Sequence, residues 1–287
     1  MHIGRPTSNM SDILVTTDWL EQHLDDPSVR ILEIGATNTD DDYRSGHAPG
    51  AIRFFWKDLS WHESDRAFVT PAEMADRLGA IGVAPDTTLV IYSDKVQYGT
   101  YVFWALTMAG HKDLRLLDGS RTKWLAEGRP LSQVVPVFDA VPYESPTADA
   151  SSRVGRDDVR NNLENDSRLM LDVRSPEEYS GERVMPSPGF DHGAERTGRI
   201  PGAVHLFFQE LLNEDDTFLS QDELRKKFTG AGAGPDQVSE VVGYCRLSHR
   251  ATLAWVAATQ ILGWNHMRIY DGSWTEWGSI VGFPIEK

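Results

Sequence analysis

A single cysteine, Cys245, lies among residues that could make its thiol a nucleophile. It follows the apolar run 241–244, typical of a buried strand, and it precedes a helix-like stretch, residues 251–262. The intervening turn carries three side chains that can be cationic: Arg246, His249 and Arg250. The thiolate is the reactive form of cysteine, and a helix N-terminus and nearby positive charge both favour it. The pattern therefore predicts an activated thiol on a strand-to-helix turn.

A packing role for Cys245 is the alternative, because a lone cysteine in a globular protein is most often a small buried hydrophobe. Such a cysteine would sit within the strand or the helix rather than between them. Packing also does not explain the cationic side chains that follow it within five positions. We therefore favour a catalytic Cys245.

The loop from Cys245 to Arg250 contains six residues, few enough to turn its backbone N–H groups inward toward the sulfur. Such amides stabilise a thiolate or the charge of a persulfide. The cationic side chains would meet an incoming anion, and Ser248 could supply a hydroxyl. With Cys245 as the catalytic residue, we expect these residues to bind substrate: Arg246, Leu247, Ser248, His249 and Arg250.

Composition limits the classes of partner. The chain has 287 residues, long enough for two domains, and a formal net charge of −15, which argues against nucleic acid and anionic membranes as partners. No apolar run reaches membrane-spanning length, and the first residues lack a secretory core. One cysteine excludes an internal disulfide and fits a reducing cytosol. Scattered histidines and acidic runs without ligand spacing predict no metal site.

An internal repeat organises the chain. The segment 46–51 resembles 198–203, and 117–120 followed by Trp124 resembles 270–273 followed by Trp277. Each half also alternates strand-like and helix-like segments. The predicted strands are 29–34, 89–92, 114–117, 168–173, 241–244 and 267–270, and the predicted helices are 71–81, 101–109, 221–228 and 251–262.

This alternation predicts an α/β fold with parallel sheets covered on both faces, and ligands bind such sheets beyond the carboxyl ends of the strands. Cys245 falls at such an end. We expect an N-terminal domain over residues 11–132, a linker over 133–152 rich in Pro, Ser, Val and Ala, and a C-terminal domain over 153–287. The second half has an insertion, 184–197, that could form a wall or lid of the site or be a neutral surface excursion.

Three motifs resemble those of tandem-domain rhodaneses, the thiosulfate or 3-mercaptopyruvate sulfurtransferases. They are the segment Tyr43–Ala51, the loop Cys245–Arg250 and the segment Tyr270–Trp277, and the resemblance covers the chain from about Asp12 onward. It implies two tandem rhodanese-like doubly wound parallel-sheet domains, of which only the C-terminal one is catalytic. Ser93 stands where the first half would need a cysteine, in a loop about one residue shorter.

The resemblance also implies a mechanism. Cys245 would take the outer sulfur of a donor to become a persulfide, releasing sulfite or pyruvate, and an acceptor such as cyanide, a thiol or a thioredoxin-like protein would remove that sulfur. The mechanism requires neither metal nor organic cofactor. Arg246 and Arg250 would bind the anionic end of the donor, and His249 would assist when protonated.

The donor prediction leans toward thiosulfate, because Arg246 and Leu247 stand where mercaptopyruvate enzymes of the family have small residues. Glu178 appears at the place of the family's substrate-binding arginine, with Arg174 nearby. We expect supporting roles for Asp172 and Arg174, as an ion pair behind the site, and for Trp274 as a lining residue. Core packing is the interpretation for Trp277.

Three alternatives remain open at this stage. A 3-mercaptopyruvate sulfurtransferase differs only in its donor. A cysteine-dependent phosphatase or arsenate reductase would use a wider loop, with five residues between Cys and Arg, whereas four separate Cys245 from Arg250 here. A non-enzymatic persulfide carrier or binding module would hold the sulfur for a partner without turnover.

Overall fold

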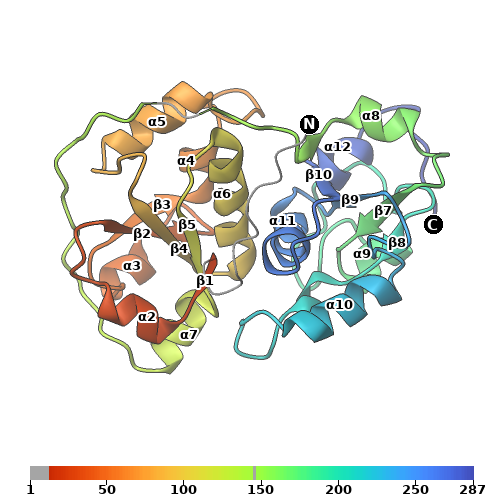
Figure 1. Ribbon diagram of the computed structural model, residues 1–287. Coiled ribbons are helices and arrows are strands. Elements are labelled where there is room, and N and C mark those ends of the chain that lie inside the picture. The colour runs from red at the N-terminus through yellow and green to blue at the C-terminus, as the bar shows by residue number, and fades with distance from the viewer. Residues whose placement is uncertain (1–12, 145–146) are drawn as a thin grey trace. The chain divides into compact units, whose positions relative to one another are not determined.

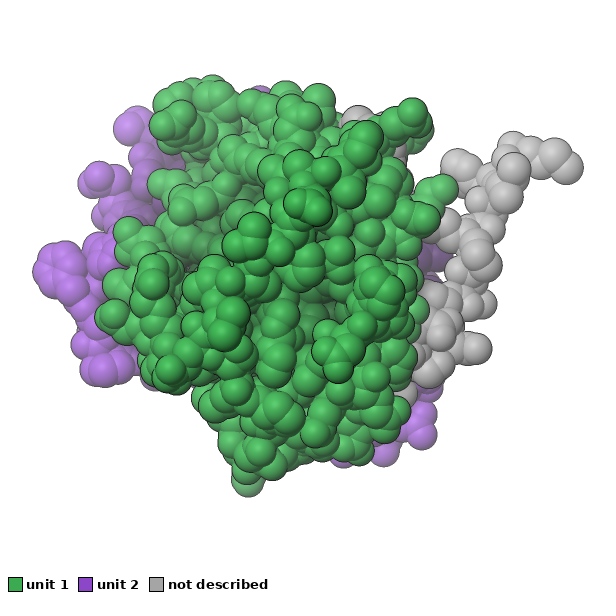
Figure 2. Space-filling model, turned by 90° about the vertical axis from the view of Figure 1, so that its left-hand side faces the viewer, with its two compact units in different colours: residues 1–150, 214–217 green, residues 151–213, 218–287 purple. Residues whose placement is uncertain are grey.

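The computed structural model describes residues 13–144 and 147–287. The chain divides into two compact units, coloured separately in Figure 2: unit 1 comprises residues 1–150 with 214–217, and unit 2 comprises 151–213 with 218–287. The segment 133–152, predicted as a linker, contains no helix or strand among its described residues. Its amides at Val141 and Asp149 donate to carbonyls of unit 1, those of Gly79 and Met108.

Unit 1 is built on a parallel five-stranded sheet in the order β1-β5-β4-β2-β3. Its central strands β2 and β4 are almost completely buried, as expected for a sheet covered on both faces. The strands are β1 Leu14–Val15, β2 Val29–Gly35, β3 Ala51–Phe55, β4 Thr88–Ser93 and β5 Leu114–Leu117.

Helices cover both faces of this sheet (Figure 1). Helices α4, α5 and α6 contact one another on one face, and α2, α3 and α7 lie on the other. A capping box between Thr70 and Glu73 fixes the start of α5. The helices are α2 Thr17–Gln22, α3 Asp41–Ser45, α4 Trp56–Ser60, α5 Pro71–Gly79, α6 Val96–Ala109 and α7 Ser120–Ala126.

Unit 2 repeats this topology. Its parallel sheet has the order β6-β10-β9-β7-β8, so each strand has a counterpart in unit 1 at the same place. The strands are β6 Arg153–Val154, β7 Arg168–Asp172, β8 Val204–His205, β9 Glu240–Tyr244 and β10 Met267–Tyr270. The sheets confirm the predicted α/β class with two doubly wound parallel-sheet domains, and they confirm the internal repeat.

The helices of unit 2 are α8 Arg156–Asn161, α9 Pro176–Ser180, α10 Gln221–Gly230, α11 His249–Trp255 and α12 Ser273–Trp277, with a 3₁₀ turn at Phe208–Leu211. The helix predicted over 251–262 begins earlier, at His249, and continues as a π-helix over Val256–Ile261. Capping boxes at Ser175–Glu178 and Ser220–Glu223 start α9 and α10.

The core of unit 2 contains both tryptophans of α12. Trp277 is fully buried among residues that include Val242, Tyr244 and Phe283, which confirms the interpretation of Trp277 as a core residue. Its indole N–H donates to the carbonyl of Pro284 at 2.7 Å, and in unit 1 the indole of Trp124 makes the matching bond to Pro130 at 3.0 Å. The tryptophans that revealed the repeat are therefore equivalent packing anchors.

Candidate active site

Cys245 directly follows β9 and has 1% of its surface exposed. Its backbone is fixed by the beginning of α12: its N–H donates to Ser273 Oγ at 3.2 Å, and its carbonyl accepts from the N–H of Trp274 at 2.9 Å. The carbonyl of the next residue, Arg246, accepts from both the N–H and the hydroxyl of Thr275, at 3.0 and 2.7 Å. The motif Tyr270–Trp277 thus serves to hold the cysteine loop.

Ser273 is the central residue of this support. Its φ of 52° lies in the left-handed region, and its hydroxyl donates to the carbonyl of Tyr270 at 2.9 Å while accepting from the Cys245 amide. Ser120 in unit 1 has the same φ of 52°, and its hydroxyl accepts from the amide of Ser93 at 2.7 Å. The repeat partner was the signal that could have identified Ser273 from sequence.

Ser248 does not present its hydroxyl as the sequence analysis expected. It is fully buried with a φ of 72°, and its Oγ donates to the carbonyl of Asp271. A second contact of 3.1 Å joins the same oxygen to the Asp271 carboxylate. The hydroxyl therefore secures the base of the loop, and the backbone amide of Ser248 is the group left for a ligand.

The loop amides lack acceptors. In the parts of the chain that the structure describes, the backbone N–H groups of Arg246, Leu247, Ser248 and Arg250 make no hydrogen bond. Protein N–H groups in such buried surroundings are normally paired, so a row of free donors beside a thiol indicates a cradle for an anion. The free donors are consistent with the prediction, made from the length of the loop, that these amides face the sulfur.

Arg250 is paired with Glu178. Its two Nη atoms donate to the two carboxylate oxygens at 2.5 and 2.8 Å, and both side chains are buried. Burial alone would lower the pKa of Arg250, but the bond to Glu178 and the charge of Cys245 raise that pKa above its ordinary value. Arg250 is thus a permanent cation beside the sulfur, although most of its donors are already used. Sequence reasoning found Glu178 but not this pairing.

Asp172 and Arg174 form the predicted ion pair, and both are completely buried. Arg174 Nη2 lies 2.6 Å from Asp172 Oδ2 and also donates to the carbonyl of Gly198 at 2.8 Å. The hydroxyl of Tyr244, at the end of β9, donates to Asp172 at 2.7 Å, and burial together with that carboxylate raises the pKa of Tyr244 well above its ordinary value. The pair anchors the strand that carries Cys245.

Trp274 is packed rather than exposed as a lining residue. It is fully buried, with the guanidinium of Arg174 4.6 Å from a ring centroid, and its indole N–H donates to the carbonyl of Arg196 at 3.0 Å. His249, the first residue of α11, is also buried, and its carbonyl accepts from the hydroxyl of Thr252 at 2.7 Å. Trp274 thus supports the loop from α12, whereas His249 is a buried residue at the beginning of α11.

Arg246 differs from the other cations of the loop. It is partly exposed, and among residues 13–144 and 147–287 its guanidinium has neither a carboxylate partner nor a hydrogen-bond acceptor. Leu247 beside it is also partly exposed. The loop Cys245–Arg250 thus carries the thiol, amides without acceptors and, within the described chain, one guanidinium without a counter-ion. Of the remaining predicted residues, Ser248, Arg250, Asp172, Arg174 and Trp274 use their side chains to support the loop.

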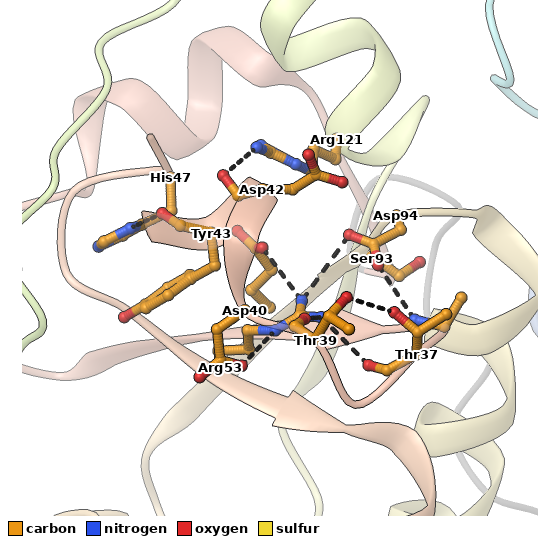
Figure 3. Close-up of polar contacts among 12 residues, drawn as sticks. Thr37, Thr39, Asp40, Asp42, Tyr43, His47, Arg53, Ser93, Asp94 and Arg121 are labelled. Atoms are coloured by element: carbon orange, nitrogen blue, oxygen red, sulfur yellow. Dashed lines mark hydrogen bonds and ion pairs between the residues drawn. The ribbon is translucent and has the colours of Figure 1, made fainter. Parts of the chain in front are cut away.

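The corresponding place in unit 1 is occupied by its own side chains (Figure 3). The hydroxyl of Ser93 donates to the carbonyl of Lys95 at 2.7 Å and accepts from the amide of Gly99 at 3.1 Å. Arg53 contacts the carboxylates of Glu33 and Asp94, at 3.4 and 3.8 Å, from the adjacent strand. These contacts are consistent with the expectation that Ser93 has no chemistry of its own.

Two other features, a metal site and a membrane-spanning helix, are not found among the described residues. In the described chain, residues 13–144 and 147–287, no group of three or more His, Cys, Asp or Glu side chains is placed to hold a metal ion. No helix within those same ranges combines the length and apolarity needed to cross a bilayer.

Comparison with known proteins identifies the class. The sequence profile of the family described as "Rhodanese-like domain" matches twice, over residues 16–127 and 155–280. The chain therefore belongs to the rhodanese family, with one domain of the family in each half, and its general function is rhodanese-type sulfur transfer.

Individual relatives span the full chain. "Sulfur carrier protein TtuD" of Thermus thermophilus is 41% identical over 283 residues, covering 96% of this chain and 97% of that protein. A Haloferax volcanii protein provisionally named a thiosulfate sulfurtransferase is 37% identical and covers 96% of each chain. The anaerobic ergothioneine biosynthesis enzyme from Chlorobium limicola shares the fold, with a TM-score of 0.82 at 24% identity over 98% of this chain and 72% of that one.

Proposed function

We propose that this protein is a thiosulfate sulfurtransferase that works through a persulfide on Cys245. The Cys245 thiolate attacks the outer sulfur of thiosulfate, the S–S bond of the donor breaks, and sulfite leaves with the bonding electron pair. A thiophilic acceptor, cyanide or a thiol, then attacks the outer sulfur of the persulfide and regenerates the thiolate. Neither half-reaction requires an external oxidant, a reductant, a metal or an organic cofactor.

The observation that carries this proposal is the set of unpaired amides around Cys245. Four loop N–H groups without an acceptor in the described chain offer donors to a charge that develops on sulfur, and they do so without rearrangement. A persulfide anion places its charge on the outer sulfur, one bond length beyond the thiolate. A compact arc formed by the six residues Cys245–Arg250 suits one sulfur atom better than the oxygens of a phosphate.

Donor recognition is assigned chiefly to Arg246. Arg250 is compensated by Glu178 and Arg174 by Asp172, so Arg246 is the loop guanidinium that can still accept a bidentate anion. An oxyanion such as the sulfonate end of thiosulfate fits that fork. The donor 3-mercaptopyruvate presents a carboxylate instead, and it is the alternative that the experiment must separate.

A sulfur-carrier role is a second candidate, favoured by the relative named a sulfur carrier protein, which is 41% identical to this chain. A carrier would hold the same persulfide and pass the sulfur to a partner thiol, such as that of a thioredoxin-like protein, with little turnover on small acceptors. A reduced, cytoplasmic location suits either role, because the one cysteine of the chain must stay free to react.

Intact mass spectrometry combined with steady-state kinetics tests the proposal. Incubation with thiosulfate should add about one sulfur atom to the wild type and none to Cys245→Ser. Thiocyanate should then form from thiosulfate and cyanide with many turnovers per protein.

Each alternative gives a different result. A mass gain with 3-mercaptopyruvate alone would reassign the donor, and a persulfide without turnover would favour the carrier. Hydrolysis of a chromogenic phosphate ester that depends on Cys245 would instead indicate a phosphatase.

A further inference from the structure

The insertion 184–197 is attached to the helix that supports the cysteine loop. Arg196 donates to the carbonyls of Trp277 and Gly278, at 3.0 and 3.1 Å, at the end of α12. It also donates to the carbonyls of Ile280 and Phe283, at 2.7 and 2.8 Å. Four carbonyls bound by one guanidinium fix the C-terminal part of the insertion to unit 2, which a neutral surface excursion would not require.

Within the insertion, Gly193 lies against the side chain of Arg246. A Cβ atom at Gly193 would be only 2.7 Å from Arg246 Nη1, 3.4 Å from its Cδ and 3.7 Å from its Cζ. The φ of Gly193 is 112°, a conformation that residues with a side chain rarely adopt. The backbone of the insertion thus lies close to the side chain of Arg246. A Cβ at Gly193 would displace the guanidinium of Arg246, and the φ of Gly193 favours glycine at this position.

Both sides of this contact are held by α12. The backbone of Arg246 is bonded to Thr275 in the middle of the helix, and Arg196, three residues after Gly193, is bonded to its C-terminal end. The guanidinium of Arg246 therefore lies against a fixed surface although it has no ion-pair partner in the described chain. A long side chain otherwise loses considerable rotamer freedom when it binds a ligand.

We propose that Gly193 is a positioning residue and that the insertion is a wall that holds the Arg246 guanidinium ready for an anion approaching Cys245. This inference rests on the proposed function for the identity of the anion, the thiosulfate donor. It assigns Gly193 no contact with the reacting sulfur. For the insertion 184–197, the sequence left open a wall or lid of the site and a neutral surface excursion, and we infer the wall.

The test compares Gly193→Ala, Arg246→Ala and the double variant. In single turnovers at limiting thiosulfate, Gly193→Ala should slow persulfide formation roughly tenfold, because the arginine must be ordered by the donor itself. The same substitution should cause no further loss in the Arg246→Ala background, since the effect acts through that side chain. Gly263→Ala, at a φ of 72° with open space around it, controls for backbone strain and should leave the rate unchanged.

A second readout does not depend on sulfur transfer. Iodoacetate is an anion and iodoacetamide is neutral, and both alkylate the one cysteine of the chain. The ratio of their rates should fall several-fold in both Gly193→Ala and Arg246→Ala, because the guanidinium attracts only the anion.

The outcomes are distinguishable. The positioning role would be overturned if Gly193→Ala left the ratio of the iodoacetate and iodoacetamide rates unchanged. It would also be overturned if Gly193→Ala slowed persulfide formation equally in the wild type and in Arg246→Ala. A wild type that forms no persulfide from thiosulfate while the ratio still responds would refute the proposed function and leave the positioning role standing.

Discussion

The pair Glu178–Arg250 offers the sharpest test of how the cysteine loop is held. Glu178 projects from α9 and Arg250 from α11, and the side chain of Glu178 is completely buried, with an exposed fraction of 0%. The change to examine is Glu178→Ala, with Glu178→Gln as the milder variant. Gln keeps an oxygen for the capping box of α9, where the N–H of Ser175 donates to Glu178 at 3.0 Å.

The expected cost follows from burial and geometry. Two charge-assisted bonds, at 2.5 and 2.8 Å, are lost in Glu178→Ala, and a guanidinium is left buried without compensation. Breaking such a pair costs about 3–5 kcal/mol, whereas a variant that keeps one acceptor should lose about 1.5–3 kcal/mol. A domain has only about 5–15 kcal/mol in total, so Glu178→Ala should leave unit 2 marginally stable.

Alkylation of Cys245 in increasing urea measures the free energy of unfolding of unit 2, because the one cysteine of the chain lies in that unit. With a slope of about 2 kcal/mol/M, the midpoint should fall by roughly 2 M in Glu178→Ala. Glu210→Ala removes an exposed pair with Lys227, whose side chains are 48% and 40% accessible, and it should cost less than about 1 kcal/mol. If Glu178→Ala and Glu210→Ala shifted the midpoint equally, the buried pair would not be what holds α11 against α9.

Three further predictions concern the donor, the first unit and pH. Arg246→Ala should raise the KM for thiosulfate about tenfold or more in steady-state kinetics while leaving the KM for cyanide unchanged, since a lost ion–ion hydrogen bond costs about 1.5–3 kcal/mol. Ser93→Cys combined with Cys245→Ser should gain no sulfur from thiosulfate by intact mass, because position 93 is buried and Arg53, which contacts the next residue Asp94, is held by Glu33; a mass gain would contradict this. Burial lowers the pKa of His111 below its ordinary value of 6.5. The stability that the neutral ring contributes is therefore complete above pH 6.5 and is lost as the pH falls below that value. Between about pH 7 and pH 5, the urea midpoint of unit 1 should decline less steeply in His111→Gln than in the wild type.

The central strands were predictable because buried parallel strands are continuous apolar runs. The predicted ranges 29–34, 89–92 and 241–244 differ from β2, β4 and β9 by no more than one residue at each end. The two-residue strands β1, β6 and β8 were missed, since two residues show no period. They are defined by their pairing with β5, β10 and β7, which depends on the whole sheet.

The candidate site was predictable only in part. The position of Cys245 at the end of a strand and the length of its loop follow from local sequence. The partner of Arg250 does not, because Glu178 is 72 positions away and stands in a Ser-x-x-Glu pattern that also describes a helix cap. The direction of the Ser248 hydroxyl depends on a φ of 72°, and residue type does not indicate that angle.

The two units also differ in how a buried carboxylate receives its counter-ion. Glu33 pairs with Tyr92 across β2 and β4, as Asp172 pairs with Tyr244 across β7 and β9. In unit 1 the guanidinium comes from Arg53 on β3, whose register partner is Glu33. In unit 2 the guanidinium comes from Arg174, which follows the end of β7 and lies two residues after Asp172.

The two units place these arginines differently at the ends of their central strands. Gly35 stands two residues after Glu33, and a Cβ there would lie 2.2 Å from Arg53 Nη2, so Arg53 takes the space that Arg174 takes in unit 2. The residue of β8 that pairs with Asp172 is His205, which turns to the carbonyl of Arg174 at 2.7 Å. The counter-ion of unit 2 therefore comes from the same segment as its carboxylate and is completely buried, and the adjacent strand β8 contributes a histidine at this place instead of an arginine.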